Sequence, residues 1–392
     1  MDVSLAERVN KLPPYIFAEM ERIILEKKRR GVRMISLSIG DPDLPPPPFI
    51  LDALREEVGN PANHNYSLSQ GEPSFRDAVA GWYKSRFNVD LDGEKEIIAL
   101  IGSKEGIANI TRAFINPGDD VLVPDPAYPV YANGGTLLCD GVPVTMPLLG
   151  ENGFKPDLEK VDASLKRRRK VKMMFLNYPN NPTAAVLDKS FLREVVEFAA
   201  ERDIIVCYDN AYSEITFDGY RAPSILEVDG AKDVAVEFNS CSKTFNMTGD
   251  RIGFAVGNSK VVEGLRKIKS QIDSGPPIYI QKVAAKALAS YGDAVVQRHL
   301  KQLNKTYQER QNILIKGLAS MGFKCEKPKG TFYVWLDCRE DSMKFAAKLV
   351  EGGVAVTPGI GFGSYGEHYV RFSITRPKEE IVEACDKMSA LK

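Results

Sequence analysis

Histidine and cysteine are scarce in this chain of 392 residues. Its three histidines, His64, His299 and His368, stand at no spacing typical of a metal site or of a Ser-His-Asp triad. The six cysteines form no C-x-x-C pair and no regular pattern, so neither a zinc site nor a disulfide framework is indicated. We therefore expect no metal and a reducing, cytoplasmic environment, with a reactive group of another kind.

An excess of charge of either sign is also absent, because Lys and Arg together number 52, as do Asp and Glu. This balance argues against binding to nucleic acid or to an anionic membrane. No stretch of about 18 apolar residues occurs, and the N-terminus lacks the apolar core of a signal peptide. The short basic runs at residues 27–30 and 166–170 are expected to be solvated faces.

The apolar residues that are present alternate between runs of strand length and helical patterns, which predicts an α/β fold with a mostly parallel sheet between helices. A chain of this length usually divides into two domains. The strands of the large domain are expected at residues 96–102, 120–124, 171–177, 204–209, 234–239 and 251–257. Amphipathic helices are expected between them at residues 106–116 and 188–202.

The C-terminal part has a different pattern and predicts a smaller α/β domain. A long helical tract at residues 277–321 precedes three expected strands, at residues 331–338, 354–357 and 369–374. We expect residues 46–284 to form the large domain and residues 285–392 the small one. The N-terminal segment 1–45, with a helix at 16–30, is expected to pack on the small domain.

Polar residues cluster where four of the expected strands end. The stretches are 101–106, 177–183, 208–212 and 240–243, and the last contains Lys243 between small hydroxyl residues. Ligands of parallel α/β sheets bind beyond the carboxyl ends of the strands, so these stretches predict one shared crevice. For the stretch around Lys243 taken alone, a solvated surface loop is the alternative.

The residues of this crevice suit a phosphorylated aromatic aldehyde. The groups expected to hold the phosphate, at a helix N-terminus and on nearby strand ends, are Ser103, Lys104, Ser240, Ser242 and Arg251. Asp209, at the end of an apolar strand, is costly to bury without a cationic partner, and a protonated ring nitrogen would supply one. The alternative role for Asp209 is a helix N-cap.

Three motifs, in this order along the chain, resemble those of the fold-type I pyridoxal-phosphate aminotransferases of classes I and II. They are Asn181-Pro182-Thr183 after one strand, Asp209-x-x-Tyr212 after the next, and Ser240-x-Ser242-Lys243 with Arg251 eight residues later. The resemblance extends from about Tyr15 to Arg371 and implies the fold of that family, with pyridoxal 5'-phosphate as cofactor.

The resemblance also implies individual roles. Lys243 would bind the cofactor covalently and then move protons, while Asp209 would pair with the ring nitrogen. Asn181 and Tyr212 would bond to the ring hydroxyl, and Tyr128 would stack on the ring. Tyr66 is similar to a tyrosine that the family donates across a dimer interface, which implies a homodimer. Arg371 matches the arginine that binds the α-carboxylate of the substrate.

Within the class, residues 36–43, 101–106 and 178–183 are most similar to the LL-diaminopimelate aminotransferases. That family transfers an amino group from LL-2,6-diaminopimelate to 2-oxoglutarate, giving tetrahydrodipicolinate and glutamate on the route to lysine. The positions that would contact the substrate are Tyr15, Gly40, Lys104, Tyr128, Asn181 and Arg371.

Three residues depart from the family pattern. Ala184 stands where Gly is usual, Asp250 precedes Arg251 where an apolar residue is commoner, and Ile278 replaces an amide side chain. An isoleucine cannot bond to the polar far end of diaminopimelate. An aminotransferase for aspartate, alanine or aromatic amino acids therefore stays open, as does a pyridoxal-phosphate C–S β-lyase, and a ligand-sensing module is a third, non-catalytic alternative.

Overall fold

The computed structural model describes residues 3–166 and 171–391. The described residues do not include residues 1, 2, 167–170 and 392. Of the basic run 166–170, only Lys166 is therefore described. Within the other basic run, Lys28, Arg29 and Arg30 are exposed, as expected. In the described ranges, no helix is both long and apolar enough to cross a membrane.

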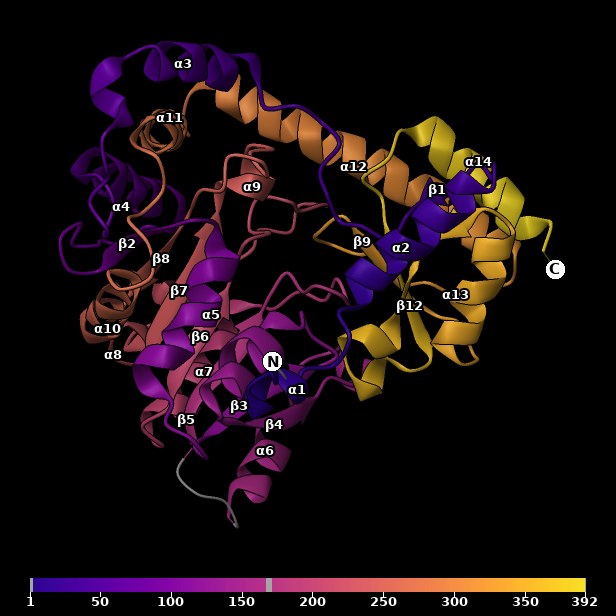
Figure 1. The fold of residues 1–392 in the computed structure, drawn as a ribbon, viewed down its shortest axis with the longest axis horizontal. Helices are drawn as coiled ribbons and strands as arrows, with labels where there is room; N and C mark the ends of the chain where they lie inside the picture. Colours follow the sequence, from indigo (N-terminus) through magenta and orange to yellow (C-terminus); the bar gives the residue numbers. More distant parts are fainter. Residues whose placement is uncertain (1–2, 167–170, 392) are drawn as a thin grey trace.

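A seven-stranded sheet forms the centre of the larger part of the molecule (Figure 1). The strand order is β2-β8-β7-β6-β5-β3-β4, and all pairs are parallel except the two that β8 makes with β2 and β7. The expected mostly parallel sheet is thus confirmed. The strand bounds are β2 Ile97–Leu100, β3 Asp120–Asp125, β4 Val142–Pro147, β5 Val171–Asn177, β6 Ile205–Asp209, β7 Ala235–Ser240 and β8 Gly253–Gly257.

Helices cover both faces of this sheet, so its strands are buried on both sides. Along β2, Ile97 and Ala99 belong to one hydrophobic cluster, while Ile98 and Leu100 belong to another. The first cluster includes side chains of α4 (Pro73–Phe87), α7 (Lys189–Ala200) and α11 (Ile278–Ala289). The second includes α5 (Ser103–Phe114) and α10 (Ser259–Lys269). This double burial explains the near-continuous apolar strands in the sequence.

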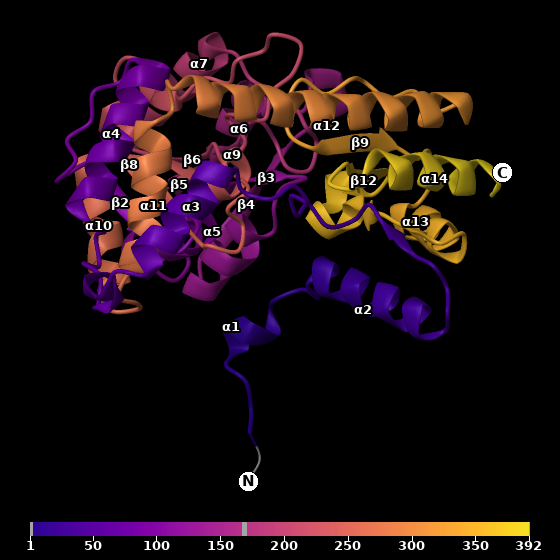
Figure 2. The same cartoon turned by 90° about the horizontal axis from the view of Figure 1, so that it is seen from above.

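The smaller part is built from both ends of the chain. An antiparallel sheet, in the order β11-β12-β9, joins β11 (Thr357–Pro358), β12 (Tyr369–Ser373) and β9 (Tyr333–Asp337). β1 (Ile35–Ser36) pairs in parallel with β10 (Val354–Ala355), which ties the N-terminal segment to this part. The helices here are α2 (Ile16–Arg29), α13 (Ser342–Glu351) and α14 (Lys378–Ser389) (Figure 2). α1 (Glu7–Asn10) lies outside the small part and contacts the larger one, where Arg8 pairs with Asp140 at 3.1 Å.

The helical tract expected at 277–321 is two helices rather than one. α11 ends at Ala289, residues 290–293 connect, and α12 (Ala294–Ser320) runs from the large sheet region to α14 (Figure 1). Gly292 and Asp293 break the pattern, and the Asp293 backbone has the extended conformation usual at an N-cap. We propose the division into segments 1–45, 46–284 and 285–392, although α11 continues across residue 284 and packs with α4.

Candidate active site

The carboxyl ends of the strands surround a cavity of about 420 Å³ between the two parts of the molecule. Every predicted site residue except Tyr66 lines it. These residues are Tyr15, Gly40, Ser103, Lys104, Tyr128, Asn181, Asp209, Tyr212, Ser240, Ser242, Lys243, Arg251 and Arg371. The roles assigned from the sequence did not include the other lining residues. Of these, Ile39, Asp41, Asn177 and Ala211 fall within stretches that the sequence singled out, whereas Phe17, Glu21, Tyr131, Thr248 and Tyr333 do not.

Asp209 is the last residue of β6 and is buried at the floor of the cavity. Its Oδ2 accepts a hydrogen bond of 2.8 Å from the Tyr131 hydroxyl, and its Oδ1 accepts one of 3.3 Å from the backbone N–H of Ala211. Burial raises the pKa of Asp209 to about 6, although these donors and Lys243 act to lower it. No helix follows β6, so the alternative role as an N-cap is wrong.

Lys243 lies in α9 (Cys241–Thr244), directly after β7. The residues beside it are buried, so the alternative of a solvated surface loop is wrong. Its Nζ donates a hydrogen bond of 3.4 Å to the carbonyl of Gly40, which comes from the N-terminal segment. The pKa of Lys243 is lowered to about 8, mainly by burial and also by Arg251 and Arg371, while Asp41 and Asp209 act to raise it. A substantial fraction of this amine is therefore neutral near pH 7 to 8.

An anion-binding cradle forms where α5 begins beside β8. Ser103 is the first residue of α5, and its N-cap, Gly102, has a φ of 75°. A Cβ at Gly102 would lie 2.1 Å from Nη2 of Arg251, so only glycine allows this approach. Arg251 donates to two backbone carbonyls, those of Thr248 and Ile101. Free N–H groups at a helix start and an arginine with uncharged partners suit a phosphate.

Arg371 is only 1% exposed, in β12 of the small sheet. Nη1 donates 2.6 Å to the Asn181 amide oxygen, and Nη2 donates 2.7 Å to the carbonyl of Ser38. Its guanidinium carbon lies 4.2 Å from the ring centre of Tyr333 and 4.7 Å from that of Phe362. Burial lowers the pKa of Arg371. Both hydrogen-bond partners are uncharged, so this buried cation lacks a bonded anion within the described ranges.

Lys104 lies at the mouth of the cavity beside two aromatic rings. Its Nζ is 3.5 Å from the Tyr15 hydroxyl, 5.2 Å from the ring centre of Tyr15 and 5.7 Å from that of Tyr128. Burial, together with the neighbouring Tyr15, raises the pKa of Tyr128, which therefore stays protonated. Tyr15 comes from the segment preceding α2, so the N-terminal segment closes one side of the cavity.

Tyr66 and Ile278 are not part of the cavity of this chain. The Tyr66 side chain is 90% exposed, and Ile278 is buried at the first position of α11. Their two segments lie side by side, because Nε2 of Gln281 donates 2.7 Å to Ser67 Oγ and 2.7 Å to the carbonyl of Pro276. Tyr66, which the resemblance assigned to a dimer interface, and Ile278, which the sequence assigned to the far end of the substrate, thus lie on neighbouring segments.

Two of the unpredicted lining residues had a signal in the sequence. Tyr131 follows Tyr128 by three residues, a spacing that brings side chains together in a helical turn, and residues 130–136 do form one. Tyr333 precedes Trp335 by two residues in β9, and Trp335 pairs with Arg371. The alternation of a strand therefore places Tyr333 on the face that carries Arg371.

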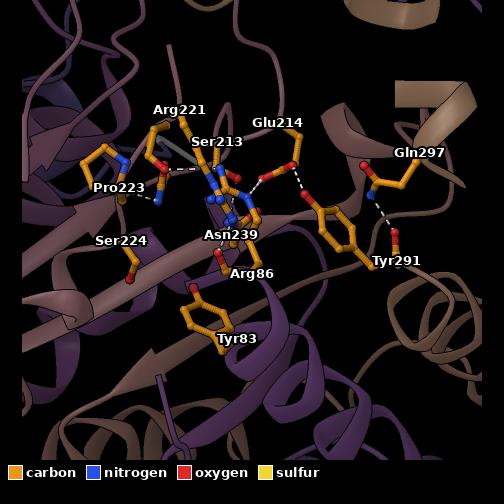
Figure 3. Close-up of polar contacts among 12 residues, drawn as sticks. Tyr83, Arg86, Ser213, Glu214, Arg221, Pro223, Ser224, Asn239, Tyr291 and Gln297 are labelled. Carbon is orange, nitrogen blue, oxygen red and sulfur yellow. Dashed lines mark hydrogen bonds and ion pairs between the residues drawn. The ribbon is translucent and has the colours of Figure 1, made fainter. Parts of the chain in front are cut away.

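A buried ion pair supports the segment that carries Tyr212. Figure 3 shows Glu214 between Arg86 and Tyr291. Arg86 Nε donates 2.9 Å to Glu214, and both side chains are buried. Asn304 of α12 donates 2.9 Å to the backbone carbonyl of Glu214. The turn after β6 is thereby fixed to α4 and to the long helix.

Ala184, one of the residues that depart from the family pattern, has a φ of 58°, where glycine is favoured.

Comparisons with known proteins place the chain in a family. The family described as aminotransferase class I and II matches residues 32–388. This match covers most of the chain, so the protein belongs to that family, and the observed fold agrees with it. The cofactor is pyridoxal phosphate.

Several curated relatives share one name along their full length. The LL-diaminopimelate aminotransferases of Desulforudis audaxviator and Moorella thermoacetica are both 50% identical over 386 residues. The match covers 98% of this chain and 96% and 97% of theirs. The enzyme of the same name from Aquifex aeolicus is 46% identical over 390 residues, 99% of each chain.

Solved structures give the same fold. Substrate-bound BacF from Bacillus subtilis has a TM-score of 0.92 at 38% identity and covers 100% of this chain and 98% of its own. Aspartate aminotransferase from Thermus thermophilus with maleate has a TM-score of 0.91 at 29% identity, with full coverage of both chains. Both likenesses span the large and small parts together.

The residues of the cavity fit pyridoxal phosphate. Asp209 is buried and is bonded by a hydroxyl and a backbone N–H rather than by a cation, so it can accept a protonated ring nitrogen. The anion-binding cradle around Ser103 and Arg251 can hold the phosphate, and the amine of Lys243 has a lowered pKa. The cavity therefore provides one group for each end of the cofactor.

Proposed function

We propose that this protein transfers an amino group from LL-2,6-diaminopimelate to 2-oxoglutarate, giving tetrahydrodipicolinate and glutamate for lysine biosynthesis. The observation that carries the proposal is the 50% identity to enzymes named LL-diaminopimelate aminotransferase over 98% of the chain. BacF and aspartate aminotransferase are less similar, at 38% and 29% identity.

The cofactor, when bound, supplies an electron-withdrawing ring that stabilises negative charge on the substrate carbon. Lys243 holds the cofactor and then, as a neutral amine, takes and returns a proton at its Nζ. Asp209 would keep the ring nitrogen protonated, while Asn181 and Tyr212 would orient the ring through its hydroxyl. Tyr128 would stack on the ring. The phosphate would be held by the N–H groups of Ser103 and Lys104 at the start of α5, together with Ser240, Ser242 and Arg251.

The far end of diaminopimelate carries an ammonium and a carboxylate, so it needs one anion and one cation. Once Arg371 holds the near carboxylate, Lys104 remains as a cation at the mouth, and Glu21 and Asp41 remain as carboxylates. Asp41 lies near enough to Lys243 to act on the pKa of its amine, which leaves Glu21 for the far end of the substrate. Glu21 lies four residues after Phe17 in α2, which puts both on one helix face. We assign the far carboxylate to Lys104, with Tyr15 beside it, and the far ammonium to Glu21.

The working form in this proposal is a homodimer that shares its sites. Tyr66 lies outside its own cavity and is almost fully exposed, which suits a residue that completes the site of a partner. Ile278 lies in the neighbouring segment and would reach the same partner site with it. Tyr66→Phe should then weaken cofactor retention, and sedimentation should give twice the mass of the chain. A monomer with full activity would contradict this part.

The test compares LL-diaminopimelate with 2-aminopimelate, which lacks only the far ammonium. Wild type should prefer diaminopimelate. Glu21→Gln should lower kcat/KM for diaminopimelate about tenfold or more, while kcat/KM for 2-aminopimelate should stay unchanged. Glu19→Gln is the matched control, because Glu19 pairs with Arg22 and does not line the cavity. Ile278→Gln should favour diaminopimelate further.

Each other outcome identifies an alternative. No reaction with diaminopimelate, but turnover of aspartate, alanine or an aromatic donor, would overturn the proposed substrate. Release of pyruvate and ammonia from a cysteine conjugate would indicate a C–S β-lyase. An equal effect of Glu21→Gln on both pimelates would leave the proposed substrate standing, but would show that Glu21 does not recognise its far ammonium.

A further inference from the structure

Asp125, the last residue of β3, binds a loop of the small part. Its Oδ2 accepts hydrogen bonds of 3.1 Å from the Ser364 N–H and 3.0 Å from the Ser364 hydroxyl, and its Oδ1 accepts 3.1 Å from the Tyr365 N–H. Gly363 permits the approach, since a Cβ there would lie 2.0 Å from Asp125 Oδ1. A fourth bond, 2.8 Å, runs from the Ala127 N–H to the carbonyl of Phe362.

The loop bound in this way covers the substrate-binding arginine. The Phe362 ring lies 4.7 Å from the guanidinium carbon of Arg371 and packs edge-on against Phe17 and Trp335. Together these rings exclude water from Arg371, which strengthens its attraction for a carboxylate. The contact between Phe362 and Arg371 lies within the small part, whereas Asp125 belongs to the large sheet.

We propose that Asp125 is a positioning residue that latches the loop 359–366 over Arg371 and so sets the affinity for the substrate carboxylate. The proposal rests on the proposed role of Arg371 and not on which amino acid is the donor. Asp125 itself touches neither substrate nor cofactor, and it does not line the main cavity. It lies three residues before Tyr128, so the same short segment reaches both the cofactor ring and the latch.

Substitutions can remove the latch in steps. Ser364→Ala removes the hydroxyl bond alone, Asp125→Asn turns one acceptor oxygen into an amide group that faces an N–H, and Asp125→Ala removes all three bonds. KM for amino donors should rise in that order, by a few fold for Ser364→Ala and about 10- to 100-fold for Asp125→Ala. kcat should change far less, because the groups that move the proton are untouched.

Tryptophan fluorescence reads the latch without any substrate. The chain has two tryptophans, and Trp335, 7% exposed, packs against Phe362, whereas Trp82, 2% exposed, lies in the core of the large part. Asp125→Ala in the holoenzyme should therefore increase quenching by acrylamide. The control is Asp157→Ala, which removes another Asp that accepts a backbone N–H, at the start of α6 (Leu158–Leu165).

The kinetics use L-glutamate and LL-diaminopimelate as separate donors. Increased quenching together with a raised KM for the donors that react would support the latch. Unchanged quenching in Asp125→Ala would overturn it whatever the substrate, and so would increased quenching with an unchanged KM. Turnover of glutamate without turnover of diaminopimelate would refute the proposed substrate only, because the latch is then still measured with glutamate.

Discussion

The hydroxyl of Tyr131 donates a hydrogen bond of 2.8 Å to Oδ2 of Asp209 at the floor of the cavity. This bond acts to lower the pKa of Asp209 and so favours the carboxylate that the ring nitrogen requires. Tyr131→Phe should weaken binding of pyridoxal phosphate and slow turnover about tenfold, since a bond to a charged group contributes about 1.5–3 kcal/mol. The Phe ring can keep the stacking with Phe175. The affinity is measured by titrating the apoproteins with the cofactor. Equal affinity of the variant and wild type would contradict the prediction.

Asp209 should make the apoprotein less stable as pH rises. Its folded pKa, about 6, is above the unfolded value of about 3.9, so its contribution is fully present below pH 4 and is lost as pH rises through 6. The loss is about 3 kcal/mol. The side chain introduced by Asp209→Asn cannot ionise. Between pH 4 and pH 8, the free energy of unfolding of this apoprotein should therefore gain about 3 kcal/mol relative to that of the wild-type apoprotein.

Urea unfolding of both apoproteins at the two pH values measures this difference. Added pyridoxal phosphate should reduce the gap, because its ring nitrogen gives the carboxylate a cation. Identical pH dependence in Asp209→Asn and wild type would show that Asp209 is not the titrating group.

Lys243 should capture the cofactor faster as pH rises. Its pKa is lowered to about 8, and only the neutral amine attacks the aldehyde, so the rate should rise up to about pH 8 and then level off. Lys243→Ala should lose the visible absorbance of the lysine-bound cofactor and turn over orders of magnitude more slowly. Stopped-flow absorbance on the apoprotein gives the pH profile. A profile still rising at pH 10 would mean that burial does not depress this pKa.

Arg371→Lys should raise KM for every amino donor alike. A lysine cannot make the two-pronged contact with a carboxylate, and it also loses the donated bonds to Asn181 and Ser38. We expect an increase of about tenfold or more in KM with a uniform pattern across donors. Steady-state kinetics with diaminopimelate, glutamate and aspartate provide the measurement, and a rise confined to one donor would place Arg371 at the far end of the substrate.

Arg86→Ala should strongly destabilise the protein. It leaves Glu214 as a buried charge without its cation, which typically costs about 3–5 kcal/mol. Replacing both partners, as Arg86→Met with Glu214→Leu, should cost less than Arg86→Ala alone. Arg55→Ala, which removes an exposed pair with Asp52, is the control and should change little. Urea unfolding compares the variants, and equal stability of Arg86→Ala and Arg55→Ala would contradict the role of the buried pair.

Much of the fold could be predicted because its strands are buried on both faces and therefore form apolar runs of strand length. β5, for example, occupies residues 171–177 as expected. β4 was missed, because Pro143 and Pro147 argue against a strand. The two prolines are tolerated in β4 because this strand is at the edge of the sheet, where fewer backbone N–H groups need partners.

The sequence by itself determined the class of chemistry, since Asp209 ends one strand, Lys243 follows the next and Arg251 stands eight residues after Lys243, and strand ends of a parallel sheet must meet. Only the tertiary structure decided what surrounds them. Tyr131 reaches Asp209 from 78 residues away along the chain, and Arg371 bonds to Asn181 across 190. The folded chain also placed Tyr66 and Ile278 outside their own cavity. Burial and contact between distant segments set pKa values and partners, and local sequence pattern carries neither.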